Sequence, residues 1–276
     1  MPPISFLSDF GHQDEFVGVV HGVIARIAPD VRVHDIGHDY PAGDIRAAAL
    51  GLARAVQYMP HGVALAVVDP GVGTDRRPIA ADTPWGYFVG PDNGLLAPAV
   101  AMIGGATAVR LIDNPELRLP ADGATFAGRD LFAPTAAVLA SGQAAFTDVG
   151  PEVDPGTVTP LMIPLVEPDG SGGVLGEVLW IDRFGNCQTN VTPEDLGGLG
   201  LTPGDEVVLG IGGTDFTVGW ASTYGDVGSG QGLVHTDSYG QIAVAVRSGR
   251  ADESFPLATR VAVTMRPPGS RLVVTG

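Results

Sequence analysis

In the first half of the chain, short apolar runs of strand type alternate with segments of helical periodicity. Residues 4–7 predict a buried strand, and apolar residues then recur at helical spacing from Phe16 to Ile27, until Pro29 ends the pattern. We predict further strands at 31–36, 63–68, 87–89 and 108–112, and helices at 44–59, 94–103 and 129–139. This alternation predicts an α/β domain with a mainly parallel sheet covered on both faces.

The pattern changes near residue 150. Prolines become frequent between Pro151 and Pro168, and a glycine-rich stretch follows. We therefore predict a linker at 161–171, between an N-terminal α/β domain (1–160) and a C-terminal domain (172–276). Strand-type runs at 174–181, 206–211, 216–218, 241–246 and 260–265, separated by glycine-rich turns, predict an antiparallel β-barrel-like domain without a convincing helix.

The basic residues exclude several classes of protein. All 15 are arginine, so Schiff-base chemistry, pyridoxal phosphate enzymes and Walker-type phosphate loops, which need a lysine, are excluded. The net charge of −16 and the lack of a basic run disfavour nucleic acid or an anionic membrane as a partner. The same charge favours a cationic ligand over an anionic one.

Hydropathy and cysteine content indicate the compartment. No window approaches 18 unbroken apolar residues, and the N-terminus lacks a basic region followed by an apolar core. We therefore expect neither a membrane span nor a signal peptide. Cys187 is the only cysteine and cannot form an internal disulfide, which fits a cytoplasmic location.

Two carboxylates follow predicted strands directly. Asp9 comes after the first strand, and Asp69 comes after the strand at 63–68. In an open parallel sheet, ligands bind beyond the carboxyl ends of the strands, so both side chains are candidate ligand-binding groups. Pro70, Gly71 and Gly73 place Asp69 on a tight loop whose backbone N–H groups can face a ligand. The alternative is that Asp69 only caps a turn.

Histidine and aspartate residues near the first two strands raise the possibility of a metal site. They are His12, Asp14, His34, Asp35, His38 and Asp39. His34 lies inside a predicted strand, and none of these residues has the helix spacing of known zinc motifs. A metal hydrolase acting through His12, Asp14 and His38 is therefore kept as an alternative. The glycine loop at 71–73 is not a dinucleotide-binding motif.

Two segments of the second domain carry candidate binding groups. In WIDRFGNCQTN, Asp182, Phe184 and Asn186 follow a predicted strand and are suited to stacking on a planar base and bonding its edge. The alternative there is an ordinary Gly-Asn turn. Ser238 and Tyr239 precede another strand. Cys187 has no histidine near it in this segment, so we interpret it as a packed residue and not a nucleophile.

Together these segments resemble the S-adenosyl-L-methionine (SAM) hydroxide adenosyltransferase family, the adenosine-forming SAM hydrolases related to the SAM-dependent fluorinase and chlorinase. The similarity runs nearly end to end. It rests on SDFG (8–11) with Asp14, VVDPGVGTDRR (67–77), GPDNGLL (90–96), TFAGRD (125–130), FGN (184–186) and SYG (238–240).

The resemblance implies water or hydroxide attack on the 5′ carbon of SAM, which gives adenosine and L-methionine. SAM is then the substrate, and no cofactor or metal is expected. The resemblance also implies a homotrimer whose active sites lie between the N-terminal domain of one subunit and the C-terminal domain of its neighbour.

The resemblance also assigns roles to particular residues. The implied substrate-binding residues are Asp9, Asp14, Asp69, Gly128, Asp182, Phe184, Asn186, Ser238, Tyr239 and Val246. Among them, Asp9 and Asp69 hold the ribose hydroxyls. Asn186 and Phe184, with the backbone near Val246, hold adenine. Asp182 and Ser238 meet the methionine ammonium. Tyr239 stands where the halogenases carry an arginine for the methionine carboxylate, which leaves that contact unassigned.

The family's water-activating set is Asp, Arg and His. Asp69 and Arg76 match the first two, but the family pattern TFHGRD reads TFAGRD here, with Ala127 at the histidine position. Two explanations are open: a natural variant that relies on Asp69 and Arg76, or an engineered His-to-Ala substitution in an otherwise intact motif. Either predicts an impaired enzyme, slower by roughly 10²–10⁴-fold if the histidine exchanges protons.

Two further functions are alternatives. A SAM- or adenosine-binding protein without turnover is consistent with Ala127. A SAM-dependent halogenase is less consistent, because the halogenases carry tyrosine where this chain has Asp69, and a carboxylate there repels halide.

Overall fold

The computed structural model describes residues 1–269 and divides the chain into two compact units, Met1–Met162 and a second that starts at Ile163. The division falls inside the segment predicted as the linker. That segment contains a short strand, β8 (Glu167–Pro168), which pairs with the following strand. Residues 270–276 of the predicted C-terminal domain lie outside the described residues.

The first unit contains a seven-stranded sheet in the order β2-β1-β3-β5-β4-β6-β7. Its strands are β1 (Ile4–Ser8), β2 (Val33–Gly37), β3 (Gly62–Val67), β4 (Pro78–Thr83), β5 (Gly86–Pro91), β6 (Ala108–Leu111) and β7 (Glu152–Val153). Strands β2, β1, β3 and β5 are parallel, and β4, β6 and β7 extend the sheet in antiparallel fashion. The predicted α/β fold is confirmed, but β4 and β7 were not predicted.

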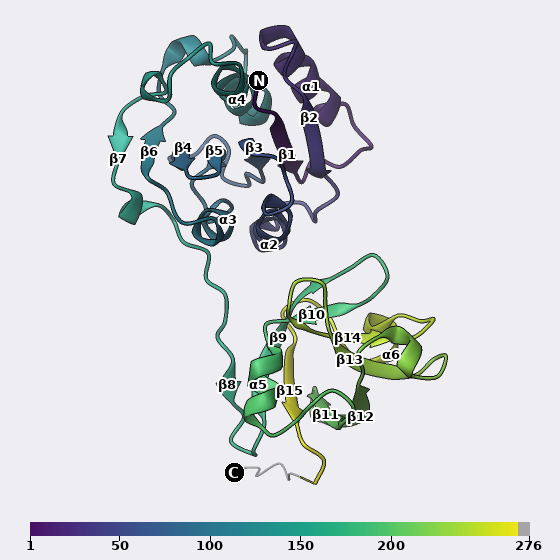
Figure 1. Cartoon of the computed structure of the whole chain (residues 1–276). Coiled ribbons are helices and arrows are strands. Elements are labelled where there is room, and N and C mark those ends of the chain that lie inside the picture. The colour runs from purple at the N-terminus through teal and green to yellow at the C-terminus, as the bar shows by residue number, and fades with distance from the viewer. Residues whose placement is uncertain (270–276) are drawn as a thin grey trace. The chain divides into compact units, whose positions relative to one another are not determined.

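Helices cover both faces of this sheet. They are α1 (Phe16–Ile27), α2 (Ile45–Val56), α3 (Ala97–Met102) and α4 (Ala133–Ser141). In Figure 1, α1 and α4 lie on one face, and α2 and α3 lie on the other. Each face has its own apolar core, and the central strand β3 is buried along its whole length because it contributes to both. That double burial explains the continuous apolar run in its sequence.

Local signals explain where the helices begin and end. Asp44 caps α2, since its carboxylate accepts a hydrogen bond from the Ala47 N–H at 3.1 Å. Helix α4 ends at Gly142, whose positive φ of 73° closes the last turn. A π-helical turn, Gly128–Phe132, directly precedes α4. The sequence predicted one regular helix here, and such turns occur often at functional sites.

The second unit is a β-barrel, as predicted. Its strands after β8 are β9 (Val174–Ile181), β10 (Cys187–Thr189), β11 (Glu206–Ile211), β12 (Thr214–Trp220), β13 (Gly232–Thr236), β14 (Ile242–Val246) and β15 (Ala262–Arg266). Pairing of β10 with β9 closes seven of the strands into a barrel, and β8 extends it beside β9. Its neighbours are antiparallel except for β12 and β13, which run parallel.

This unit also contains two short helices that we did not predict. They are α5 (Pro193–Gly198) and α6 (Ala251–Ser254). Helix α5 begins with a capping box, in which Thr192 and Asp195 bond each other's backbone N–H groups at 3.2 and 2.8 Å. Within residues 1–269, no helix is both long enough and apolar enough to cross a membrane.

Because β3 is buried along its whole length, shortening one of its side chains should destabilise the first unit. We expect Leu65→Ala, which removes a fully buried side chain, to lower the free energy of unfolding of the first unit by about 2–5 kcal/mol. Urea unfolding followed by circular dichroism measures this change. Met102→Ala, at an exposed position of α3, is the control and should leave the transition in place.

Candidate functional site

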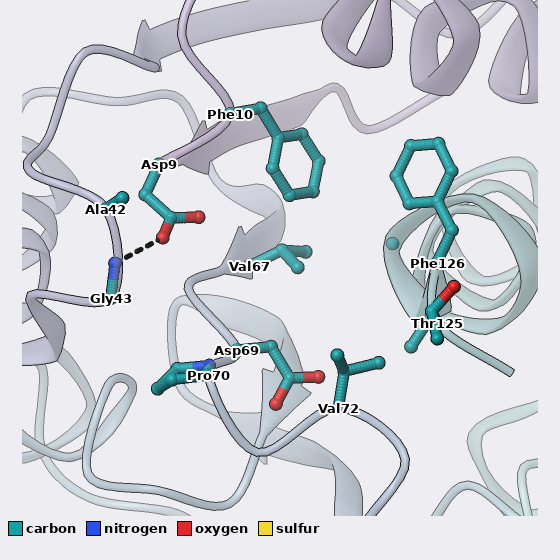
Figure 2. Close-up of a pocket in the computed structure, with 12 residues that line it drawn as sticks. Asp9, Phe10, Ala42, Gly43, Val67, Asp69, Pro70, Val72, Thr125 and Phe126 are labelled. Atoms are coloured by element: carbon teal, nitrogen blue, oxygen red, sulfur yellow. Dashed lines mark hydrogen bonds between the residues drawn. The ribbon is translucent and has the colours of Figure 1, made fainter.

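The carboxyl ends of β1 and β3 open into a pocket of about 350 Å³ in the first unit. Ser8 pairs with Val67 in the parallel register, so the residues that follow these two strands lie side by side. In Figure 2 the carboxylates of Asp9 and Asp69 point into the same space. The pocket is lined by Asp9, Phe10, Ala42, Gly43, Val67, Asp69, Pro70, Val72, Thr125, Phe126, Ala127 and Gly128.

Asp9 is fixed by the loop before α2. Its Oδ2 accepts a hydrogen bond from the Gly43 N–H at 2.7 Å, drawn as the dashed line in Figure 2. Gly43 has a φ of +72°, which glycine adopts without strain. This contact leaves Oδ1 of Asp9 for a ligand hydroxyl.

Asp69 forms a bidentate ion pair with Arg76 across the glycine loop. The Arg76 Nε lies 2.8 Å from Oδ1 and 2.9 Å from Oδ2 of Asp69, and Nη2 also donates to Oδ2. Both side chains are mostly buried, with 6% of Asp69 and 14% of Arg76 exposed. The fork of the guanidinium therefore holds the carboxylate in one orientation at the pocket wall.

Two aromatic rings also line the pocket. The rings of Phe10 and Phe126 pack edge to face with centroids 5.6 Å apart, and Figure 2 shows Phe10 on the side of Asp9 and Phe126 across from it. Gly128 lies directly behind Phe10, because a Cβ placed there would lie 2.9 Å from the ring. Aromatic rings and two carboxylates in one pocket suit a ligand with an uncharged ring and polar hydroxyls.

The motif GPDNGLL anchors the Asp69 loop and does not line the pocket. Asn93 donates through Nδ2 to the Val68 carbonyl at 2.8 Å, directly before Asp69. Arg77 donates through Nε to Asp92 at 2.8 Å, directly after Arg76. The loop is therefore held at both ends.

A buried polar chain lies behind Asp9. The Ser8 hydroxyl lies 2.7 Å from Nδ1 of His38, and Nε2 of His38 lies 3.0 Å from Asp35. Ser8 Oγ also accepts from the Phe10 N–H at 3.4 Å. His38 is 1% exposed, and burial lowers the pKa of its imidazole despite the opposing effect of the Asp35 carboxylate, which accepts from the ring.

The metal hypothesis gains no support from this region. His12 pairs instead with Asp39 at 3.0 Å, and Asp14 is exposed and does not line the pocket. In residues 1–269, no group of three or more histidine, cysteine or acidic side chains is arranged to hold a metal ion.

The second unit has a hollow of its own, of about 240 Å³. It brings together four of the predicted residues, namely Asp182, Asn186, Ser238 and Tyr239. Asp182 is fixed by three hydrogen bonds, from the Phe184 and Asn186 N–H groups at 2.8 and 2.9 Å and from Nδ2 of Asn186 at 2.8 Å. Burial raises the pKa of Tyr224 in the same hollow, and the charges of Asp182 and Asp237 add to that rise.

Three other residues named from the sequence do not line this hollow. Phe184 is 72% exposed, and Val246 is buried in β14. Cys187 is fully buried, and its burial raises the pKa of the thiol to about 12, with smaller contributions from Asp252 and Asp182. The thiol is protonated at neutral pH, which supports the interpretation of Cys187 as a packed residue.

Sequence reasoning missed several residues that line the two hollows. Phe10 and Phe126 belong to the motifs SDFG and TFAGRD, and Trp180 and Gln188 belong to the segment WIDRFGNCQTN, but none of them was assigned a role from the sequence. Tyr224, His235 and Asp237 line the second hollow because the barrel brings them together, and no local pattern marks them.

Comparison with known families agrees with this architecture and these motifs. Residues 4–150 match the SAM hydroxide adenosyltransferase N-terminal domain, and residues 176–264 match the C-terminal domain of that family. The chain belongs to the SAM hydroxide adenosyltransferase family, as the sequence motifs indicated.

Individual relatives cover the whole chain. A protein of Salinispora tropica named (R)-S-adenosyl-L-methionine hydrolase is 47% identical over 99% of this chain and 98% of its own length. A fluorinase of an Actinoplanes species is 25% identical over 96% of this chain and 97% of its own. Among solved structures, an uncharacterized conserved protein from Thermotoga maritima has a TM-score of 0.87 and 35% identity, and covers 95% of this chain and 99% of its own.

The lowered pKa of His38 predicts that the free energy of unfolding depends on pH. Burial lowers the pKa of His38 in the folded protein, so the unfolded chain binds a proton at this residue more readily below a pKa of about 6.5, and stability falls as pH drops through that value. We expect a contribution of at most about 1.4 kcal/mol per pH unit from this one proton. Urea unfolding between neutral and mildly acidic pH measures the slope.

Two variants isolate this effect. His38→Gln should flatten the slope, whereas His61→Gln, at an exposed histidine, should leave it unchanged. An equal slope in His38→Gln and the parent protein would show that another group causes the pH dependence.

Proposed function

We propose that this protein hydrolyses SAM to adenosine and L-methionine by attack of water or hydroxide on the 5′ carbon. The observation that carries the proposal is the Asp69–Arg76 ion pair, which fixes a carboxylate in a pocket that also contains Asp9. The names of the relatives, SAM hydrolase among them, support the same reaction.

The chemistry of SAM requires few catalytic groups from this pocket. Its sulfonium is a good leaving group, because the electron pair of the breaking C–S bond returns to a positively charged sulfur. The thioether leaves as a neutral group, so no general acid is needed. The protein must supply an oriented, partly deprotonated water on the opposite side of the carbon. Asp9 and Asp69 also favour a cationic substrate electrostatically.

Asp69 and Arg76 act together on that water. The Asp69 carboxylate accepts a proton or hydrogen bond from it, and Arg76 stays protonated and stabilises the developing hydroxide. Ala127 also lines the pocket but has no group that exchanges protons. We propose that the protein is consequently a slow, impaired hydrolase, in which Asp69 and Arg76 carry the reaction.

The remaining roles divide between the two units. Asp9 and Asp69 hold the ribose hydroxyls. Asn186 and Phe184, with the backbone near Val246, hold adenine, and Asp182 and Ser238 hold the methionine ammonium. Asp14, Gly128 and Tyr239 complete the proposed binding set. We propose that a homotrimer in the cytoplasm forms the site, with one subunit's first unit facing a neighbour's second.

Chromatography of the products after incubation with SAM tests the reaction. Adenosine and methionine in equal amounts support it, and 5′-halogenated adenosine in the presence of halide would instead indicate a halogenase. Activity that persists after chelation is expected, because the proposed reaction uses no metal. Loss on chelation would favour the metal hydrolase of His12, Asp14 and His38.

Asp69→Asn tests the catalytic carboxylate. The amide keeps the shape of the side chain but removes its charge and its ability to take a proton, so we expect adenosine formation to fall by roughly 10²–10⁴-fold. Arg77→Gln is not a suitable control, since Arg77 anchors the same loop. Asp75→Asn, at an exposed position of that loop, is the matched control and should keep the parent rate.

Ala127→His tests the impairment. An imidazole at this position would restore a proton-exchanging group, and we expect a gain of roughly 10²–10⁴-fold in turnover. Ala127→Phe, of similar bulk but without a titratable group, should give no gain. Unchanged SAM hydrolysis in Ala127→His would show that position 127 has no part in catalysis.

Ala127 also favours a second candidate function, a SAM- or adenosine-binding protein without turnover. Calorimetry with SAM distinguishes the two. Heat of binding without released adenosine supports the binding protein, and heat of binding with adenosine and methionine supports the enzyme.

A further inference from the structure

Ala127 lines two hollows of the first unit at once. The first is the pocket of Asp9 and Asp69, and the second is a neighbouring hollow of about 470 Å³. The second hollow is lined by Gly73, Thr74, Arg76, Pro78, Arg118, Leu119, Ala121, Asp122, Gly123, Ala124, Ala127, Asp130 and Leu131. Only a methyl group stands at the position that both hollows share.

The proposed catalytic pair, Asp69 and Arg76, also connects these two hollows. Asp69 lines the first hollow and Arg76 lines the second, and the bidentate ion pair connects them. Arg76 is held from its other side, because its guanidinium carbon lies 5.3 Å from the centre of the Phe132 ring. A reactant in the second hollow therefore lies against Arg76, the partner of Asp69, without occupying the space of the organic substrate.

The positive and negative side chains that line the second hollow are equal in number. Arg76 is paired with Asp69, and Asp130 is paired with Arg129 through bonds of 2.5 and 2.9 Å. Arg118 and Asp122 contribute one charge of each sign. The lining is polar but without net charge, which favours a small neutral polar molecule over an anion or a cation.

We propose that the second hollow admits a small neutral nitrogen base, of the size of imidazole, and that this base attacks the 5′ carbon in place of water. The inference rests on the proposed function, since it takes the same electrophile in the first pocket. It adds a second reactant site and an adenosyl-transfer activity to the hydrolysis.

The reaction balances without a further reagent. The lone pair of the unprotonated imidazole nitrogen forms the new N–C5′ bond. The C5′–S bond breaks, and its electron pair returns to sulfur, which leaves as the neutral thioether of methionine. The alkylated imidazolium then loses its N–H proton to bulk water and gives 5′-imidazolyl-5′-deoxyadenosine.

The test is product analysis with SAM and increasing imidazole, at about pH 8.5, well above the ~6.5 of an unperturbed imidazole side chain. We expect the imidazole adduct alongside adenosine, in a ratio that saturates with imidazole because the base is bound. Azide, an anion of similar size, should give less adduct. Heat-denatured protein sets the background of the uncatalysed reaction.

Matched variants locate the site. Ala124 is exposed and lines the second hollow but not the first, so Ala124→Trp should fill the hollow and lower the adduct roughly tenfold, as expected when a positioned reactant is lost. Calorimetry should show unchanged affinity for SAM. Ala145→Trp, the same change at an exposed alanine outside both hollows, should leave the adduct unchanged.

Each outcome decides the inference. Adduct that falls in Ala124→Trp but not in Ala145→Trp supports it. Adenosine without adduct, faster adenosine formation without adduct, equal adduct in both variants, or more adduct with azide would overturn it and leave the hydrolysis standing. Bound SAM that yields neither product would overturn the proposed function itself.

Discussion

Two adjacent arginines bind two different carboxylates, and the geometry of the candidate site depends on both pairs. Arg76 holds Asp69 at the pocket wall, and Arg77 holds the buried Asp92, which is 2% exposed and also accepts from the Thr159 N–H at 2.7 Å. A buried carboxylate that lost its arginine would be left without compensation, at a cost of about 3–5 kcal/mol. The loop that carries Asp69, Arg76 and Arg77 is therefore held by both pairs, and Asp69 has little freedom to move.

The glycine loop folds around a carboxylate of its own chain. Its glycines let the chain turn tightly between the end of β3 and Arg76, and the anionic group that the loop meets is the protein's own Asp69. Most acidic side chains of the described residues are exposed, whereas Asp69 is mostly buried.

The fold was largely predictable because its strands and helices alternate with clear periodicity. The limits of α1, β9 and β11 matched the predicted segments closely, since each has a continuous apolar pattern between turn residues. Strand β4 was missed because it opens with Pro78 and pairs in antiparallel fashion at a position where a parallel unit was expected. The parallel contact of β12 with β13 depends on barrel closure, which no local pattern encodes.

The candidate site was predictable where it depends on strand order. Asp9 and Asp69 were each named because they follow a strand of a parallel sheet, and the family resemblance assigned them to one site. The Gly43 contact and the Ser8–His38 chain were not predictable, since they join residues about thirty positions apart through tertiary packing. The residue roles taken from the family stay predictions, and Phe184, Val246 and Asp14 in particular do not line the hollows described above.

The close approach of Gly128 to Phe10 couples two segments that are distant in the sequence. The turn after β1 and the π-helical turn before α4 meet at this contact, where the added atom of any other residue would press on the ring. The position of the Phe10 ring, and of Asp9 beside it, therefore depends on this one contact with Gly128. A displacement of the π-helical turn would therefore move Phe10, next to Asp9, as well as position 127.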